Sequence, residues 1–208
     1  MTTQEQIYFG VTRFGKSGYM ASKEPIMSLD QRAIYFGVTR FGKSGYMTTK
    51  EPTMPLDPEV DLFWRKTVSA VDQLLACLDG LTETELNWRP AENTNSLFVL
   101  ATHLLGNVEE NIFGVLGGQA VQRDRDAEFI SQGTAVEPIR QRWQTLQQRA
   151  TTVLTQLSQT ELTRERPHPR RGQITGREVC WVVALHAAEH RGQATLTRDL
   201  ILAARAKQ

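Results

Sequence analysis

Two histidines stand four residues apart in HAAEHRGQATLTRDL, the segment at residues 186–200. On a helix, positions i and i+4 hold Cβ atoms about 5–6 Å apart, so the rings of His186 and His190 can converge on one metal ion. Neutral imidazole nitrogens bind zinc at about 2.0–2.1 Å, and a facing helix must then supply a third ligand. His103 is the remaining histidine in a helical segment. The pattern therefore favours a metal site of His103, His186 and His190 over three separately hydrogen-bonded helix residues.

Two other interpretations of the histidines fit less well. His168 lies between two prolines in RPHPRR, which predicts a solvated loop residue. HAAEH also matches the H-x-x-E-H pattern of inverted zinc peptidases, whose third ligand is an acidic residue well downstream in a larger domain. Only 18 residues follow His190 here, and Asp199 is the one acid among them. We therefore do not expect a peptidase site of that kind.

Four amphipathic segments are expected to position the histidines. Ser96 is a good N-cap residue for the second, and Thr175 with Glu178 forms a capping box for the fourth. Apolar residues recur with a helical period in all four, which cover residues 57–80, 96–117, 136–157 and 175 to near the C-terminus. The three candidate ligands lie on or beside the inward stripes of the second and fourth. The pattern predicts an all-α protein, a four-helix bundle.

The segment before the helices contains a tandem repeat. IYFGVTRFGKSGYM occurs at residues 7–20 and again, unchanged, at 34–47. Two copies are too few to bury a continuous core, and the repeat shows no helical period. We therefore predict a duplicated, disordered tail at residues 1–55 and a helical domain at 56–208. Within that domain, the polar link at 116–135 is long enough to cross the end of the bundle and cover part of a site.

Composition limits the class of protein. The chain has 40% hydrophobic and 23% charged residues and a net charge of +1, without the basic excess typical of phosphate-binding surfaces. No apolar run approaches the roughly 18 residues that span a bilayer, and we see no secretory signal. Cys77 and Cys180 are far apart in apolar helical patterns, which suits core thiols in a reducing compartment. These features predict a soluble cytoplasmic protein with no nucleic-acid partner and no membrane contact.

With three histidines placed on two helices, the body resembles the DinB/YfiT-like superfamily over about residues 58–205. The matching segments are LTETELNWRPAENTNSLFVLATHLLGNVEEN at 81–111 and HAAEHRGQATLTRDL. The resemblance implies a four-helix bundle in a mirror variant of the up-and-down topology. It also implies a divalent metal held by His103, His186 and His190. Several members of that superfamily use a low-molecular-weight thiol such as bacillithiol, mycothiol or glutathione, as S-transferases or thiol-dependent isomerases. The duplicated tail lies outside the resemblance.

A metal-dependent enzyme is the first functional hypothesis. Three neutral imidazoles leave the ion its full charge and an open position, as in catalytic sites. The ion could acidify a water molecule for hydrolysis or bind a thiol co-substrate as thiolate, which predicts a hydrolase or a thiol S-transferase acting on a small molecule. Nitrogen ligands suit zinc or nickel, and also accept iron or copper. Glu189 is the nearest candidate base, with a solvated helix carboxylate as its alternative.

The alternative function is a non-catalytic, metal-binding scaffold for a stress response. Such a protein is expected to form a homodimer through its helices. Their apolar faces are wider than a single narrow helix–helix contact requires. A third idea, a DNA-damage factor that touches DNA, rests only on the family's name and conflicts with the near-zero net charge. Turnover by the metal-loaded protein separates the enzyme from the scaffold.

Overall fold

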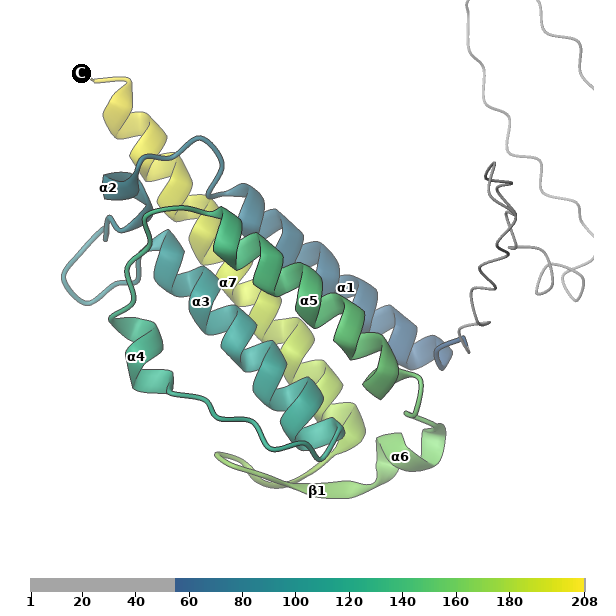
Figure 1. Ribbon diagram of the computed structural model, residues 1–208. Coiled ribbons are helices and arrows are strands. Elements are labelled where there is room, and N and C mark those ends of the chain that lie inside the picture. The colour runs from purple at the N-terminus through teal and green to yellow at the C-terminus, as the bar shows by residue number, and fades with distance from the viewer. Residues whose placement is uncertain (1–54, 208) are drawn as a thin grey trace, which may run out of the picture. The chain divides into compact units, whose positions relative to one another are not determined.

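The computed structural model describes residues 55–207, which form a bundle of four long helices (Figure 1). The long helices are α1 (Pro58–Ala76), α3 (Leu97–Val108) with its π-helical continuation η2 (Glu109–Leu116), α5 (Glu137–Leu154) and α7 (Gly176–Arg205). Shorter elements are α2 (Glu83–Leu86), α4 (Arg125–Phe129), α6 (Gln159–Thr163) and a hairpin of β1 (Glu165–His168) and β2 (Gly172–Thr175). The predicted all-α four-helix bundle is confirmed. The tail predicted at residues 1–55 lies, apart from Pro55, outside the described residues.

The long helices begin where local side-chain chemistry predicts. The Asp57 carboxylate accepts a hydrogen bond from a backbone N–H in the first turn of α1. The Ser96 hydroxyl accepts a hydrogen bond from the backbone N–H of Val99 in α3, at 3.2 Å. Thr175 and Glu178 form the expected capping box, in which each side chain accepts a hydrogen bond from the backbone of the other residue. These caps fix the starting points of α3 and α7, the two helices that carry the candidate ligands.

The apolar stripes meet in a continuous core between the four helices. Burial of these side chains away from water is the main stabilising term for such a bundle. The stripe residues that are buried are Val60, Val71, Leu75, Leu78, Leu100, Leu104, Val108, Ile112, Ile139, Trp143, Leu146, Ala150, Val153, Leu157, Val179, Val183, Ala194 and Ile201. Cys77 and Cys180 are free and buried, as expected. Desolvation raises the pKa of the Cys180 thiol to about 11, so this thiol stays protonated at neutral pH.

A π-helical segment follows α3 directly. The sequence predicts one regular helix from Ser96 to Gly117, but the chain changes to π-helical geometry over the eight residues of η2. Wider turns of this kind are rare, and they are frequently found at functional sites. Two adjacent carboxylates stand at its start. Glu109 accepts a hydrogen bond from Arg142 of α5, and Glu110 accepts one from Arg123 in the link before α4. The apolar spacing of the sequence did not predict this change of geometry.

The hairpin corrects the expectation for His168. Its strands pair antiparallel, with His168 opposite Gly172, and β1 contacts η2. His168 is therefore buried rather than solvated, and its Nε2 lies 3.1 Å from Oδ1 of Asn111 on η2. Burial lowers the pKa of its imidazole. Neither four-residue strand, ERPH or GQIT, shows the apolar alternation by which strands are recognised in a sequence, so the hairpin was not predicted.

The outer side of α7 exposes several large apolar side chains. Trp181 is 54% exposed and packs edge-on against Phe63 with ring centroids 5.9 Å apart. Leu185, Leu196 and Leu200 are exposed on the same helix. The homodimer expected from surplus apolar surface stays a prediction. Within residues 55–207, no helix combines the length and the hydropathy that crossing a bilayer requires.

Candidate metal centre

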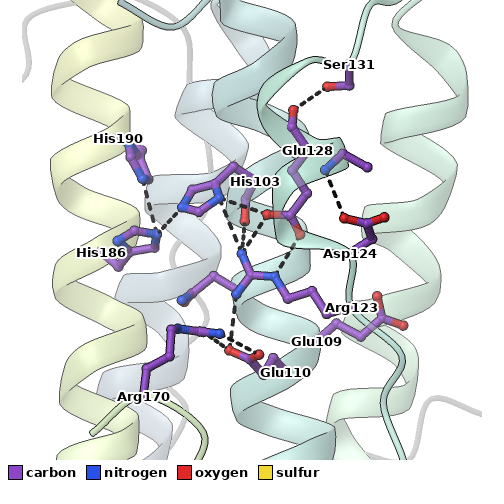
Figure 2. A network of polar contacts seen from close by, with 12 residues as sticks. His103, Glu109, Glu110, Arg123, Asp124, Glu128, Ser131, Arg170, His186 and His190 are labelled. Carbon is purple, nitrogen blue, oxygen red and sulfur yellow. Dashed lines mark hydrogen bonds and ion pairs between the residues drawn. The ribbon is translucent and has the colours of Figure 1, made fainter.

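The three candidate ligands meet between α3 and α7 (Figure 2). His186 and His190 lie on successive turns of α7, and His103 faces them from α3. Nε2 of His186 lies 3.2 Å from Nε2 of His103 and 3.1 Å from Nε2 of His190. One ring nitrogen from each histidine lies within 4.8 Å of the other two. The i, i+4 spacing and the partner on a facing helix therefore bring all three imidazoles to one point.

Neighbouring acceptors fix which nitrogen of two rings carries the proton. Nδ1 of His103 lies 2.8 Å from Oε2 of Glu128, and Nδ1 of His190 lies 2.8 Å from Oε1 of Gln193. A carboxylate or an amide oxygen can only accept a hydrogen bond, so each Nδ1 is the N–H donor. Nη2 of Arg123 also lies 3.3 Å from Nδ1 of His103, but the shorter contact with the Glu128 carboxylate decides the assignment. In a neutral imidazole the other nitrogen then has a free lone pair. His103 and His190 thus turn an unprotonated Nε2 toward His186.

This arrangement fits a metal cation better than it fits hydrogen bonds alone. Nε2 of His186 carries at most one hydrogen when the ring is neutral, yet it contacts two unprotonated nitrogens. At least one of these contacts therefore sets two lone pairs against each other. Zinc–nitrogen bonds of about 2.0–2.1 Å in a tetrahedron place ligand nitrogens roughly 3.3 Å apart. The observed 3.1 and 3.2 Å separations are close to that value.

The rings of His186 and His190 are neutral at physiological pH. Desolvation by burial, together with the positive potential of the neighbouring histidines and of Arg123, lowers the pKa of His186 to about 3. Desolvation also lowers the pKa of His190. His103 and His190 are buried, whereas His186 is half-buried, so the centre meets solvent mainly at His186. Neutral imidazole is the form that binds metals.

A chain of alternating charges, buried as far as Glu110, leads away from His103 (Figure 2). Glu128 contacts His103 and accepts two hydrogen bonds from Arg123, which also donates to Glu110. Arg170 at the hairpin turn completes the chain through Glu110. Burial alone would raise the pKa of the Glu128 carboxyl, but hydrogen bonds from His103 and Arg123 outweigh it and hold the pKa below its usual value.

Most of this charged chain was missed by sequence reasoning. The link at residues 116–135 was expected to cover part of a site, and it supplies both Arg123 and Glu128. Nothing in its polar sequence singles out these two residues among their charged neighbours. Glu110 lies one contact further from His103, beyond Arg123. Gln193 of α7 accepts a hydrogen bond from Nδ1 of His190.

Glu189 lies on α7 directly before His190, and its side chain is exposed. It is not among the residues whose ligand atoms converge. Its role as a base stays a prediction. Arg198 of α7 donates hydrogen bonds to the carbonyl oxygens of Cys77 and Asp79 after the end of α1.

The metal-free protein is expected to lose stability as the pH falls below about 6.5. Above the unfolded-state pKa of 6.5, His186 is neutral in both states. Between 6.5 and the folded-state value of about 3, only the unfolded chain binds the proton, so unfolding is favoured. For one such group, the free energy of unfolding falls by up to about 1.4 kcal/mol for each pH unit in this range. Thermal melting from pH 7.5 to 5.5 measures it, and His186→Gln should flatten the dependence. An equally steep fall in that variant contradicts this assignment.

Solved structures with the same fold come from several bacteria. A conserved protein from Enterococcus faecalis superposes with a TM-score of 0.57 at 16% identity, covering 69% of this chain and 97% of its own. A DinB-like protein from Bacillus cereus gives a TM-score of 0.54 at 17% identity, covering 68% of this chain and 91% of its own. At these identities the likeness shows the fold. None of the curated proteins matches the chain in sequence.

A third structure corrects the exclusion of nucleic acid. The colibactin self-resistance protein ClbS, solved in complex with a dsDNA, is 16% identical, covers 67% of this chain and 95% of its own, and has a TM-score of 0.48. The complex is a property of ClbS. With this finding, the exclusion of a nucleic-acid partner made from sequence is corrected and is not maintained. That prediction used whole-chain net charge, which averages over the surface and does not report local charge.

The family comparison covers the bundle and the histidines together. The family model described as the DinB superfamily matches residues 67–194, which is more than half of the chain. The match includes His103 on α3 and both histidines of α7. The chain belongs to the DinB superfamily.

Proposed function

We propose that this protein is a metal-dependent enzyme whose divalent ion is held by His103, His186 and His190. The observation that carries the proposal is the convergence of three Nε2 atoms, with 3.2 and 3.1 Å between neighbours. Membership of the DinB superfamily supports it. Three nitrogen ligands suit zinc or nickel first, and iron or copper also bind such sites.

The ligand set favours catalysis over a structural role. Structural zinc sites have four protein ligands, whereas catalytic sites have three and an open position. Three neutral imidazoles would also leave the charge of the ion uncompensated. A divalent ion there supplies Lewis acidity, which lowers the pKa of a coordinating water or thiol. This chemistry suits two reactions. One is hydrolysis of a small molecule, and the other is transfer of a group between a small-molecule substrate and a low-molecular-weight thiol co-substrate.

The residues of the chain divide the remaining tasks. Buried His103 and His190 are held by Glu128 and Gln193, so their rings cannot turn without breaking a hydrogen bond. Half-buried His186 lies at the side from which a substrate reaches the centre. Glu189 stands next to His190 on the exposed side of α7 and is the candidate that would accept or return a proton.

A turnover screen tests the proposal. The zinc- or nickel-loaded protein is mixed with a panel of low-molecular-weight thiols and model electrophiles, and separately with hydrolysable esters. We expect metal-dependent turnover that is lost in His186→Ala. Glu189→Gln should keep its metal and lower kcat by about 100-fold or more if Glu189 is the base. Full metal loading without turnover across the panel supports the non-catalytic scaffold instead.

A further inference from the structure

We infer that Glu128 is a positioning residue that holds His103 in its metal-binding orientation, and that the link carrying Glu128 completes the metal centre. The inference rests on the proposed metal site and adds to it a group outside the three ligands. Glu128 belongs to α4, a helix of five residues in the long connection between the two halves of the bundle. The connection is therefore part of the site and not only a linker.

Both oxygens of the Glu128 carboxylate are engaged. Oε2 lies 2.8 Å from Nδ1 of His103 and accepts a hydrogen bond from Nη2 of Arg123 at 2.7 Å. Oε1 accepts from Nε of Arg123, also at 2.7 Å. Arg123 donates in addition to the backbone carbonyl of His103 at 3.2 Å. Arg123 therefore links the Glu128 carboxylate to the backbone of His103. The same carboxylate contacts the side chain of His103.

The next residue of α4 supports the same ring. Phe129 packs on the His103 imidazole with ring centroids 4.8 Å apart and an angle of 35° between the planes. The side chains of Arg123 and Glu128 are only 5% and 9% exposed. Hydrogen bonds in such a water-poor site are stronger than at the surface. His103 is therefore clamped at Nδ1 by Glu128 and on its ring face by Phe129.

A glycine in α3 makes room for this clamp. Gly106 lies three residues after His103, inside the helix, where glycine is a poor helix former. A Cβ at this position would lie 2.9 Å from Cδ of Glu128 and 3.0 Å from Nε of Arg123. Any larger residue must displace the Glu128–Arg123 pair. Helix α3 therefore has a poor helix-forming residue at the turn that contacts the Glu128 carboxylate.

The expected consequence is on metal affinity. A carboxylate on Nδ1 fixes the ring orientation and the tautomer, and it makes Nε2 a stronger donor to a metal. Removing such a partner usually weakens metal binding by about 10–100-fold. Because binding and docking are linked, a metal on His103 should in turn stabilise the docked link.

The experiment compares zinc affinity in full-length variants by competition with a chromogenic chelator. Glu128→Gln should bind zinc about 10–100-fold more weakly than the wild type. Glu109→Gln is the matched control, because Glu109 also pairs with an arginine, Arg142 at 2.9 Å, and contacts none of the three ligands. It should retain wild-type affinity within about twofold, as expected for a charge outside the site. Gly106→Ala should weaken binding as Glu128→Gln does, although it removes neither a charge nor a ligand.

A spectroscopic signal separates positioning from a general loss of structure. In the zinc-loaded protein, the Nδ1 proton of His103 should give a protected downfield NMR signal. The signal should persist in Glu109→Gln and be lost or shifted upfield in Glu128→Gln. The inference is overturned if the wild type binds zinc and Glu128→Gln shows the same affinity and the same NMR signal. That result leaves the proposed metal site unaffected. A wild type that binds no zinc overturns both. If Gly106→Ala does not fold, the comparison of Glu128→Gln with Glu109→Gln still decides.

Discussion

Alanine at His103, His186 or His190 is expected to abolish stable metal binding. Each of the three contributes one converging Nε2 atom, and no described carboxylate or cysteine joins the cluster to replace it. Four-ligand zinc sites bind with apparent free energies of about 10–16 kcal/mol, so one ligand accounts for several kcal/mol, or roughly a 100-fold change in affinity or more. Elemental analysis of each purified variant measures the loss directly.

His168→Gln is the control for removing a histidine. His168 is buried and contacts Asn111 and the hairpin backbone, but it is not one of the converging histidines. The variant can melt at a lower temperature because of this burial, yet it should retain its metal. The account is contradicted if one of the three alanine variants stays fully loaded, or if His168→Gln loses metal as completely as they do.

Removal of the metal is expected to lower the melting temperature strongly. An ion held by His103 on α3 and two histidines on α7 cross-links two helices whose contact would otherwise be only side-chain packing. A ligand that binds only the folded state at 1,000 times its Kd adds about 4.1 kcal/mol. For a domain of this size, that corresponds to a shift of roughly 8–16 °C. Melting curves with one equivalent of zinc and with excess chelator measure it.

The His186→Ala variant is the matched control for this shift. It should melt at the same temperature with and without zinc, because its site no longer holds the ion. A wild type whose melting temperature does not respond to zinc or to chelator would show that no ion bridges the helices. A shift of equal size in His186→Ala would assign the stabilisation to another site.

The parts of the fold that the sequence predicted correctly depend on local chemistry. Ser96 caps α3 and the Thr175–Glu178 box starts α7, and both are contacts within one helical turn. The apolar period then decides which face of each helix is buried. His103 and His190 point inward for the same reason. The convergence of three helical histidines could therefore be predicted before any tertiary structure was available.

The parts that the sequence missed depend on contacts between distant segments. Glu128 meets His103 across 25 residues, and His168 meets Asn111 across 57. Neither partner differs in type or local pattern from exposed residues nearby. The π-helical turn and the short hairpin are likewise stabilised by packing rather than by propensity. The exclusion of nucleic acid was wrong for a related reason, because net charge contains no information on where charges lie.

Metal stoichiometry of the wild-type protein tests the central claim most directly. The protein is purified without chelators, analysed for its metals, stripped, and titrated with zinc near pH 7.5 by calorimetry. We predict a single divalent-ion site per chain, with an affinity tighter than micromolar and with His103, His186 and His190 as its ligands. No uptake of zinc, nickel, iron or copper at micromolar concentration would show that the three imidazoles are only neighbours on facing helices, and it would contradict the proposed enzyme together with its metal.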